Sequence, residues 1–187
     1  LDESSRLSPG NRQQTFAGVS FGWNMMEENW LAGLVNVLQQ LKPRISYGRA
    51  GLQDGIGFFD FMAELPASNN LVLDDLRQTY VQQLSLPSRF LGWEIVETKN
   101  LGLDFAMLNS KVRGSFDYFL KNNINMLVPL TLPGTIGLAI PRSNDGRLET
   151  RGWEAQVHYS DRLWDKVDIS IGVNLADNTN KLVRYTG

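Results

Sequence analysis

The chain contains no cysteine and only one histidine, His158, in 187 residues. The absence of cysteine excludes a disulfide scaffold and thiol chemistry. A single histidine is poor material for a metal site or for an activated serine, because each needs further positioned partners. We therefore expect the chain to have no catalytic residues, no metal and no cofactor.

Long apolar runs and an excess of one charge are absent as well. No stretch approaches the ~18 apolar residues that a membrane helix needs. Lys and Arg number 18 against 20 Asp and Glu, which gives a net charge of −2. Nucleic-acid binding usually requires a basic surplus, so we do not expect it here. The chain starts without Met and without a signal peptide, and we expect it to be a piece of a longer protein.

Alternation of apolar and polar residues with a period of two is the dominant pattern. Along residues 112–121, for example, Val112, Phe116 and Tyr118 share one side and polar residues alternate with them. Successive side chains of a strand point to opposite faces, so the pattern predicts a sheet between two unlike media. The expected strands span residues 15–23, 41–48, 93–107, 112–121, 148–160 and 167–175, and a seventh begins near residue 181.

The expected connections differ in length at the two ends of the strands. Short turns are expected at residues 109–110 and 161–166, and a short helix is expected after Trp23. Long connections, residues 49–91 and 122–145, join the strands at the other end. Outer-membrane barrels have this asymmetry, with short periplasmic turns and longer extracellular loops.

Three local signals add detail to this layout. Pro43 cannot donate to a ladder, so we expect it at the start of its strand or at a bulge. Leu76, Tyr80 and Leu84 indicate a small helix within the first long connection. Residues 144–146, Asn-Asp-Gly, predict a turn.

Several short motifs occur in a characteristic order along nearly the whole chain. They are residues 19–23 (VSFGW), 41–48 (LKPRISYG), 100–105 (NLGLDF), 114–119 (GSFDYF), 132–134 (LPG) and 151–154 (RGWE). In this order and spacing they resemble the barrel of SusC/RagA-type TonB-dependent outer-membrane transporters of the Bacteroidetes. Such transporters have a plugged barrel of ~22 strands. The resemblance implies an all-β fold in which residues 1–187 form six or seven antiparallel strands of a transmembrane barrel, without its plug domain.

The resemblance also implies a function and partners. A transporter of this kind imports glycan oligosaccharides or peptides across the outer membrane, and TonB drives the import. A SusD-like surface lipoprotein covers the barrel mouth. TonB would act through parts of the protein that are not in this chain.

Alternation divides the candidate site residues between a wet lumen and the lipid bilayer. The candidates for the lumen are Lys42, Arg44, Asn100, Asp104, Arg113, Asp117, Glu154, His158 and Asn174. The candidates for the lipid face or its aromatic girdles are Trp23, Tyr47, Tyr118, Trp153, Tyr159 and Ile171, and Trp93 is expected in the same girdles. Phe58, Phe59 and Phe61 are candidate loop contacts, which either pack within their loop or touch a partner that covers the barrel.

Other interpretations of the same residues exist. Asp104, Asp117 and Glu154 could act as paired carboxylates in glycoside hydrolysis, and His158 could be a metal ligand. Charges interspersed along a lumen wall explain them better, because alternation places all four on the polar face. The alternative fold is a soluble, secreted β-sandwich for binding or adhesion, which would bury the apolar rows between two sheets.

Overall fold

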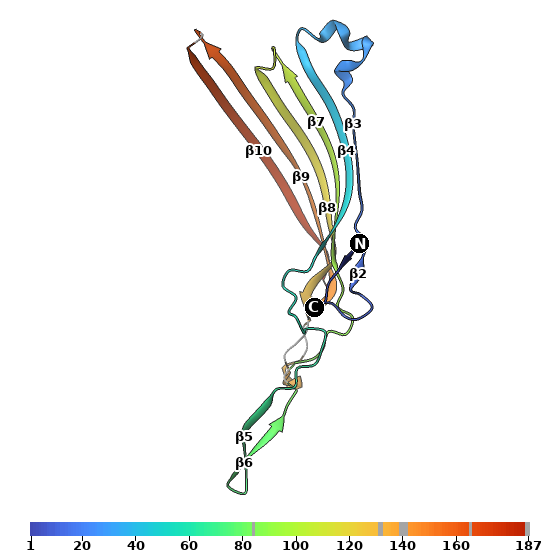
Figure 1. Cartoon of the computed structure of the whole chain (residues 1–187), viewed down its shortest axis with the longest axis vertical. Coiled ribbons are helices and arrows are strands. Elements are labelled where there is room, and N and C mark those ends of the chain that lie inside the picture. Colours follow the sequence, from blue (N-terminus) through green and yellow to red (C-terminus); the bar gives the residue numbers. More distant parts are fainter. Residues whose placement is uncertain (84, 131–132, 139–141, 165, 186–187) are drawn as a thin grey trace.

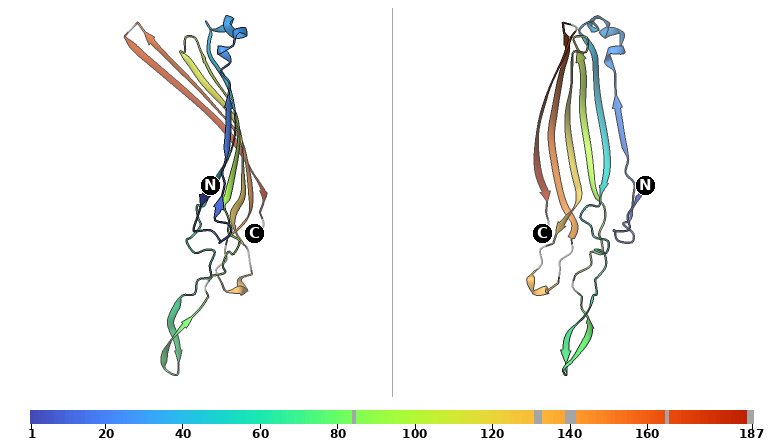
Figure 2. Two further views of the ribbon diagram at one scale, coloured as in Figure 1. Left: turned by 45° about the vertical axis from the view of Figure 1, so that its right-hand side comes forward. Right: turned by 60° about the vertical axis from the view of Figure 1, so that its left-hand side comes forward.

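Antiparallel strands dominate the computed structural model, which describes residues 1–83, 85–130, 133–138, 142–164 and 166–185. The main sheet has six strands in the order β10-β9-β8-β7-β4-β3, and it forms one curved and twisted wall (Figure 1; Figure 2). Its strands are β3 (Gly18–Gly22), β4 (Leu38–Leu52), β7 (Glu94–Met107), β8 (Val112–Pro129), β9 (Arg142–Leu163) and β10 (Val167–Arg184).

The connections confirm the expected difference between the two ends. At one end lie the turn 108–111, the short connection between β9 and β10, and two short 3-10 helices, η1 (Met25–Glu27) and η2 (Asn29–Leu34) (Figure 1). The other end, called the loop end here, carries the long connections and the small elements β1 (Asp2–Glu3), β2 (Gln13–Gln14), β5 (Ala67–Leu73), β6 (Leu76–Val81) and η3 (Gly134–Ile136). Within the described residues, no helix has the length and apolar character of a membrane span.

The six-stranded sheet is a single layer. Its apolar rows are open to the surroundings, since Val19 is 68% exposed, Leu101 58% and Ile171 57%. A β-sandwich would bury these rows under a second sheet. The described residues contain no such second layer, which argues against the sandwich.

The buried core lies in the connections at the loop end instead. Leu7, Ile56, Leu91 and Trp93 form this loop core, and Phe16 packs against it. The Trp93 indole donates a hydrogen bond to the Arg12 carbonyl at 3.0 Å, and its ring meets Phe16 edge-on with centroids 5.4 Å apart. Trp93 is only 9% exposed, so its assignment to a lipid girdle is wrong.

Several strands are longer than the alternation predicts. The ladder of β10 runs without a break to Leu182, so a separate strand beginning near Lys181 is wrong. The β8 and β9 strands continue pairing beyond Lys121, which shortens their connection to residues 130–141. The Asn-Asp-Gly motif therefore lies inside β9, where Gly146 pairs with Met126 at a bulge, and the predicted turn there is wrong.

The first long connection holds a β-hairpin where a helix was expected. Leu73 pairs with Leu76, and the two residues between them, Asp74 and Asp75, have φ of 51° and 59°. Two successive positive φ angles define the type I′ turn that favours tight hairpins. The expected helix at Leu76 and Tyr80 is thus wrong, while Leu84 lies outside the described residues, as do Leu132 of the LPG motif and Pro141.

Pro43 occupies the interior of β4, opposite Leu103, so its expected place at a strand start or a bulge is wrong. The Pro43 carbonyl accepts a hydrogen bond from the Trp23 amide at 3.1 Å, on the side of β3. The nitrogen and carbonyl of one strand residue point the same way, so the missing donor also faces β3. The proline therefore interrupts no bond toward β7, and on its other side β3 has already ended at Gly22.

The loop core generates a stability prediction for the complete protein. Leu91→Ala removes a side chain that is 2% exposed. We expect the free energy of local unfolding of the loop core to fall by about 2–4 kcal/mol, because a cavity remains. Hydrogen exchange should then show faster opening of the connections around Leu7 and Ile56. Phe59→Ala is the matched control, since Phe59 is 62% exposed, and equal exchange in both variants would contradict the role of the loop core.

Candidate functional site: the two faces of the sheet

The ladder register sorts the side chains into two faces. Arg44 pairs with Gly102, Gly102 with Asp117, and Asp117 with Glu154, which puts these residues in one row of one face. All nine lumen candidates share this polar face: Lys42, Arg44, Asn100, Asp104, Arg113, Asp117, Glu154, His158 and Asn174. By the same alternation, Trp23, Tyr47, Tyr118, Trp153, Tyr159 and Ile171 share the opposite, apolar face.

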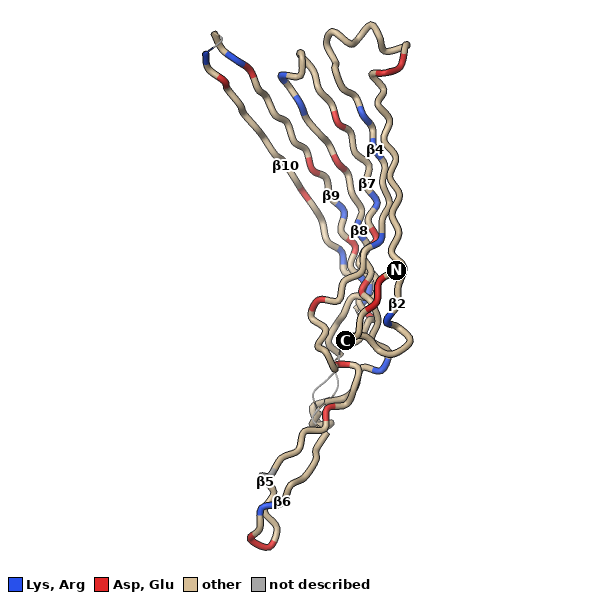
Figure 3. Tube along the Cα trace, viewed as in Figure 1, with Lys and Arg blue, Asp and Glu red and all other residues tan. Residues whose placement is uncertain are grey.

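An ion-paired group, called the Arg44 cluster here, lies on the polar face. Arg44 Nη2 donates to Asp104 Oδ1 at 2.8 Å and to Asp117 Oδ2 at 3.1 Å. Asn100 Nδ2 donates to Asp117 Oδ1 at 2.8 Å. One guanidinium thus joins two carboxylates, as expected of interspersed charges on a wet wall. Figure 3 shows that acidic and basic residues are also mixed along β9 and β10.

Gly102 makes the Arg44 cluster possible. It lies on β7 between Arg44 of β4 and Asp117 of β8. A Cβ at this position would lie 2.6 Å from Asp117 Oδ1 and 2.9 Å from Arg44 Cζ. The absence of a side chain therefore opens the path by which Arg44 reaches across a whole strand.

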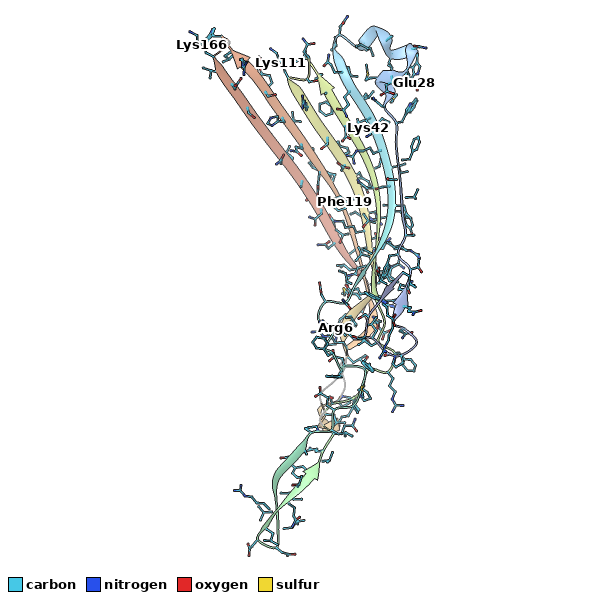
Figure 4. The ribbon with its side chains drawn as sticks, in the orientation of Figure 1. Arg6, Glu28, Lys42, Lys111, Phe119 and Lys166 are labelled. Carbon is cyan, nitrogen blue, oxygen red and sulfur yellow. The ribbon has the colours of Figure 1, made fainter. Side chains whose placement is uncertain are left out.

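Phe119 is the aromatic exception on the polar face, and a glycine accommodates it. A Cβ on its β9 neighbour Gly152 would lie 2.6 Å from Phe119 Cζ, so the ring covers this glycine. The Lys121 ammonium lies 4.8 Å from the centroid of the ring. Phe119 thus packs against the backbone of the wall near the middle of its height (Figure 4).

His158 lies among polar neighbours on the same face. Its Nε2 is 3.0 Å from Ser170 Oγ, and it faces Arg113 in the register. Within the described residues, no group of three or more His, Asp or Glu side chains could hold a metal ion. The contacts of His158 are those of a polar wall residue.

The apolar face carries a band with aromatic and charged borders. Toward the loop end, Trp153 stacks on Phe116 with centroids 6.3 Å apart, and Tyr118 pairs with Trp153. Toward the turn end, Tyr159 donates to Asp161 at 3.0 Å. Lys111 of the adjacent turn lies 2.7 Å from the same carboxylate, and this hydrogen bond raises the pKa of Lys111.

The border of this band runs obliquely across the strands. Toward the loop end, the first charged residue of the face is Arg49 on β4, Lys99 on β7 and Asp177 on β10. In the register these three residues belong to successive rows of this face. Lys99 shares the row of Tyr47, one row from Arg49. Asp177 shares the row of Tyr118 and Trp153, which is the next row. Strands that tilt relative to the layer they cross produce this drift.

The loop candidates lie at the surface beside the N-terminal segment. Phe58 and Phe59 are 63% and 62% exposed, and the Arg6 guanidinium lies 4.3 Å from the Phe58 ring. Arg12 lies 5.7 Å from the Phe61 ring. The sequence analysis missed that residues 1–16 dock on these loops. The only signal for it is that Leu7 and Phe16 are isolated apolar residues in a polar segment.

Sequence comparison identifies the kind of wall that these faces form. A family model described as TonB dependent receptor-like, beta-barrel, matches residues 4–187. The chain belongs to this family. It is 32% identical over 190 residues to the TonB-dependent receptor SusC of Bacteroides thetaiotaomicron, a match that covers 100% of this chain and 19% of that protein. It is also 30% identical to the TonB-dependent receptor P3 of Formosa agariphila, over 98% of this chain and 18% of P3.

Solved structures of the RagAB peptide importer share the fold of this TonB-dependent receptor segment. The closed-closed state superposes with a TM-score of 0.86 at 20% identity and covers 98% of this chain and 20% of that chain. A second RagAB structure gives a TM-score of 0.84. The chain thus spans about a fifth of the length of these relatives. The resemblance to SusC/RagA-type barrels is confirmed, and so is the partial antiparallel barrel.

The Arg44 cluster leads to a prediction for the complete receptor. Gly102→Ala should displace the guanidinium and cost about 1–3 kcal/mol of unfolding free energy, as overpacking generally does. Thermal unfolding in detergent measures the change. Gly172→Ala is the control, because its Cβ would meet only His158 Nδ1 at 3.4 Å. If the Gly102→Ala receptor unfolds at the same temperature as the control, the close passage of Arg44 over Gly102 is ruled out.

Proposed function

We propose that this sheet is part of the wall of an outer-membrane, TonB-dependent transporter that imports glycan oligosaccharides or peptides. The observation that carries the proposal is the single-layer sheet with one exposed apolar band and one polar, ion-paired face. Such a sheet suits the boundary between hydrocarbon and a water-filled lumen. Family membership supports the same conclusion.

The height of the apolar band fits a bilayer. On β10 the outward residues from Val167 to Leu175 are all apolar, over nine residues of strand. At ~3.3 Å per residue and a tilt of ~40°, nine residues span about 23 Å along the membrane normal. The apolar band of outer-membrane barrels is ~25 Å tall.

The open edges of the sheet fit a larger cylinder. Among the described residues, β3 and β10 each have a partner on one side only. A transmembrane sheet cannot leave its edges unpaired, because lipid offers no hydrogen bonds. The remaining strands of the transporter close the barrel in this proposal, and residues 1–187 form one partial-barrel domain without the plug.

The two faces then take the roles that the alternation predicts. The lumen candidates, among them Arg44, Asp104 and His158, line the conduit around a plug. Trp23, Tyr47, Tyr118, Trp153 and Tyr159 form the aromatic girdles, and Ile171 meets lipid tails. The long connections shape the outer vestibule, where Phe58, Phe59 and Phe61 touch a SusD-like lipoprotein.

The relatives support two substrate classes and an energy source. The RagAB neighbours are described as peptide importers, which supports a peptide, and the oligosaccharide rests on the resemblance to SusC/RagA-type transporters. The TonB dependence in the names of the relatives supports coupling to TonB. Transport tests this proposal directly. In cells that carry the complete gene, uptake of labelled oligosaccharides or peptides should disappear when the gene or TonB is deleted, and uptake independent of TonB would refute it.

A charge on the apolar face should be far more costly than one on the polar face. Ile171→Arg places a cation at mid-depth in the hydrocarbon and should cost about 2–4 kcal/mol. Asn174→Arg should cost much less, because Asn174 pairs with Gln156 on the polar face. Folding of the complete barrel into lipid vesicles at graded urea measures both free energies. Equal losses in the two variants would contradict the assignment of the faces.

A further inference from the structure

The apolar face contains a groove at the border of its band toward the loop end. The groove has a volume of about 570 Å³ and lies across three neighbouring strands, β4, β7 and β8. These strands are interior to the sheet, so no further barrel strand can cover the groove. It is lined by Ile45, Tyr47, Lys99, Leu101, Tyr118 and Leu120.

The floor and walls of the groove follow from the register. Leu101 and Lys99 of β7 lie along its floor, and Leu101 is 58% exposed. Ile45 and Tyr47 flank them on β4, while Tyr118 and Leu120 flank them on β8. The groove therefore runs along β7, with a tyrosine on each side, an apolar end at Leu101 and a charged end at Lys99.

Of the described basic side chains near the groove, two are ion-paired and one is not. Arg49 is paired with Glu97, whose carboxylate also accepts a hydrogen bond from Tyr47 at 3.2 Å. Arg151, which follows in the same row as Lys99 and Leu120, is paired with Glu149. Lys99 forms no ion pair within the described part of the chain. The band border next to the groove thus has a spare positive charge.

We propose that this groove binds one anionic acyl lipid, with an acyl chain along Leu101 and Ile45 and the phosphate at Lys99. The inference rests on the proposed function, which turns this face toward lipid and the loop end toward the outer leaflet. Lys99 lies on the loop side of Leu101, as a headgroup contact in that leaflet requires. An interfacial lysine attracts anionic lipid, and apolar side chains bind the tail.

Native mass spectrometry of the complete transporter in detergent tests the lipid site. Phosphatidylglycerol and phosphatidylcholine with identical acyl chains are the probes. We expect the wild type to retain phosphatidylglycerol preferentially. Lys99→Gln should weaken phosphatidylglycerol binding about three- to tenfold and leave phosphatidylcholine unchanged. Leu101→Phe should fill the groove and weaken the binding of both lipids.

Lys121→Gln is the matched control, because Lys121 lies one row from Lys99 but on the polar face. Equal phosphatidylglycerol binding by wild type, Lys99→Gln and Leu101→Phe would overturn the lipid site. If Lys99→Gln instead changes self-association of the transporter and leaves the lipid adducts unchanged, the result would overturn the lipid site in favour of a contact with a second copy. If the lipid site fails this test but uptake still depends on TonB, the proposed function stands. A protein that is soluble without detergent would refute both the lipid site and the proposed function.

Discussion

The register of the antiparallel ladder is the constraint on which both faces of this protein depend. It places Arg44, Gly102 and Asp117 in one row and Ile45, Leu101 and Tyr118 in the next. A slip of one residue between two strands would exchange the faces and put charged groups among apolar ones. The Arg44 cluster favours the native register, because Arg44 reaches Asp117 only where a glycine separates them. Cross-strand ion pairs of this half-exposed kind are individually weak, so their value here is geometric as much as energetic.

Alternation alone predicts the two faces of this sheet but not the ends of its strands. The signal arises where one face meets an apolar medium and the other meets water, as from Val112 to Lys121. In the proposed barrel both faces meet water beyond that level, and the contrast disappears at Asn122 and Asn123, although β8 continues to Pro129. Strand length beyond the band depends on pairing with β9, which leaves no periodic pattern in either strand. For the same reason β10 reads as two strands in the sequence and is one in the structure.

Local turn chemistry was a less dependable guide than alternation. Asn-Asp-Gly forms no turn here, because β9 pairs with β8 on both sides of the motif. Asn144 and Asp145 lie at the bulge between these pairs. Asp74 and Asp75 do form a tight turn, although the glycine that usually indicates one is missing. The loop core was beyond sequence reasoning, because Leu7 and Leu91 meet through contacts between distant parts of the chain. Leu7 and Phe16 are isolated apolar residues in a polar segment, and nothing local indicates which distant residues they contact.

The positions of the core and of the band explain how a wall one layer thick can present ordered loops. The described residues bury almost nothing against the faces of the sheet, so in the proposed transporter the wall depends on its neighbouring strands and on the bilayer for stability. The loops cannot use lipid in this way, because they lie beyond the apolar band. They are ordered by a small apolar core of their own, to which the N-terminal segment adds Leu7 and Phe16. In a transporter this division lets the wall match the membrane while the vestibule keeps a defined shape in water.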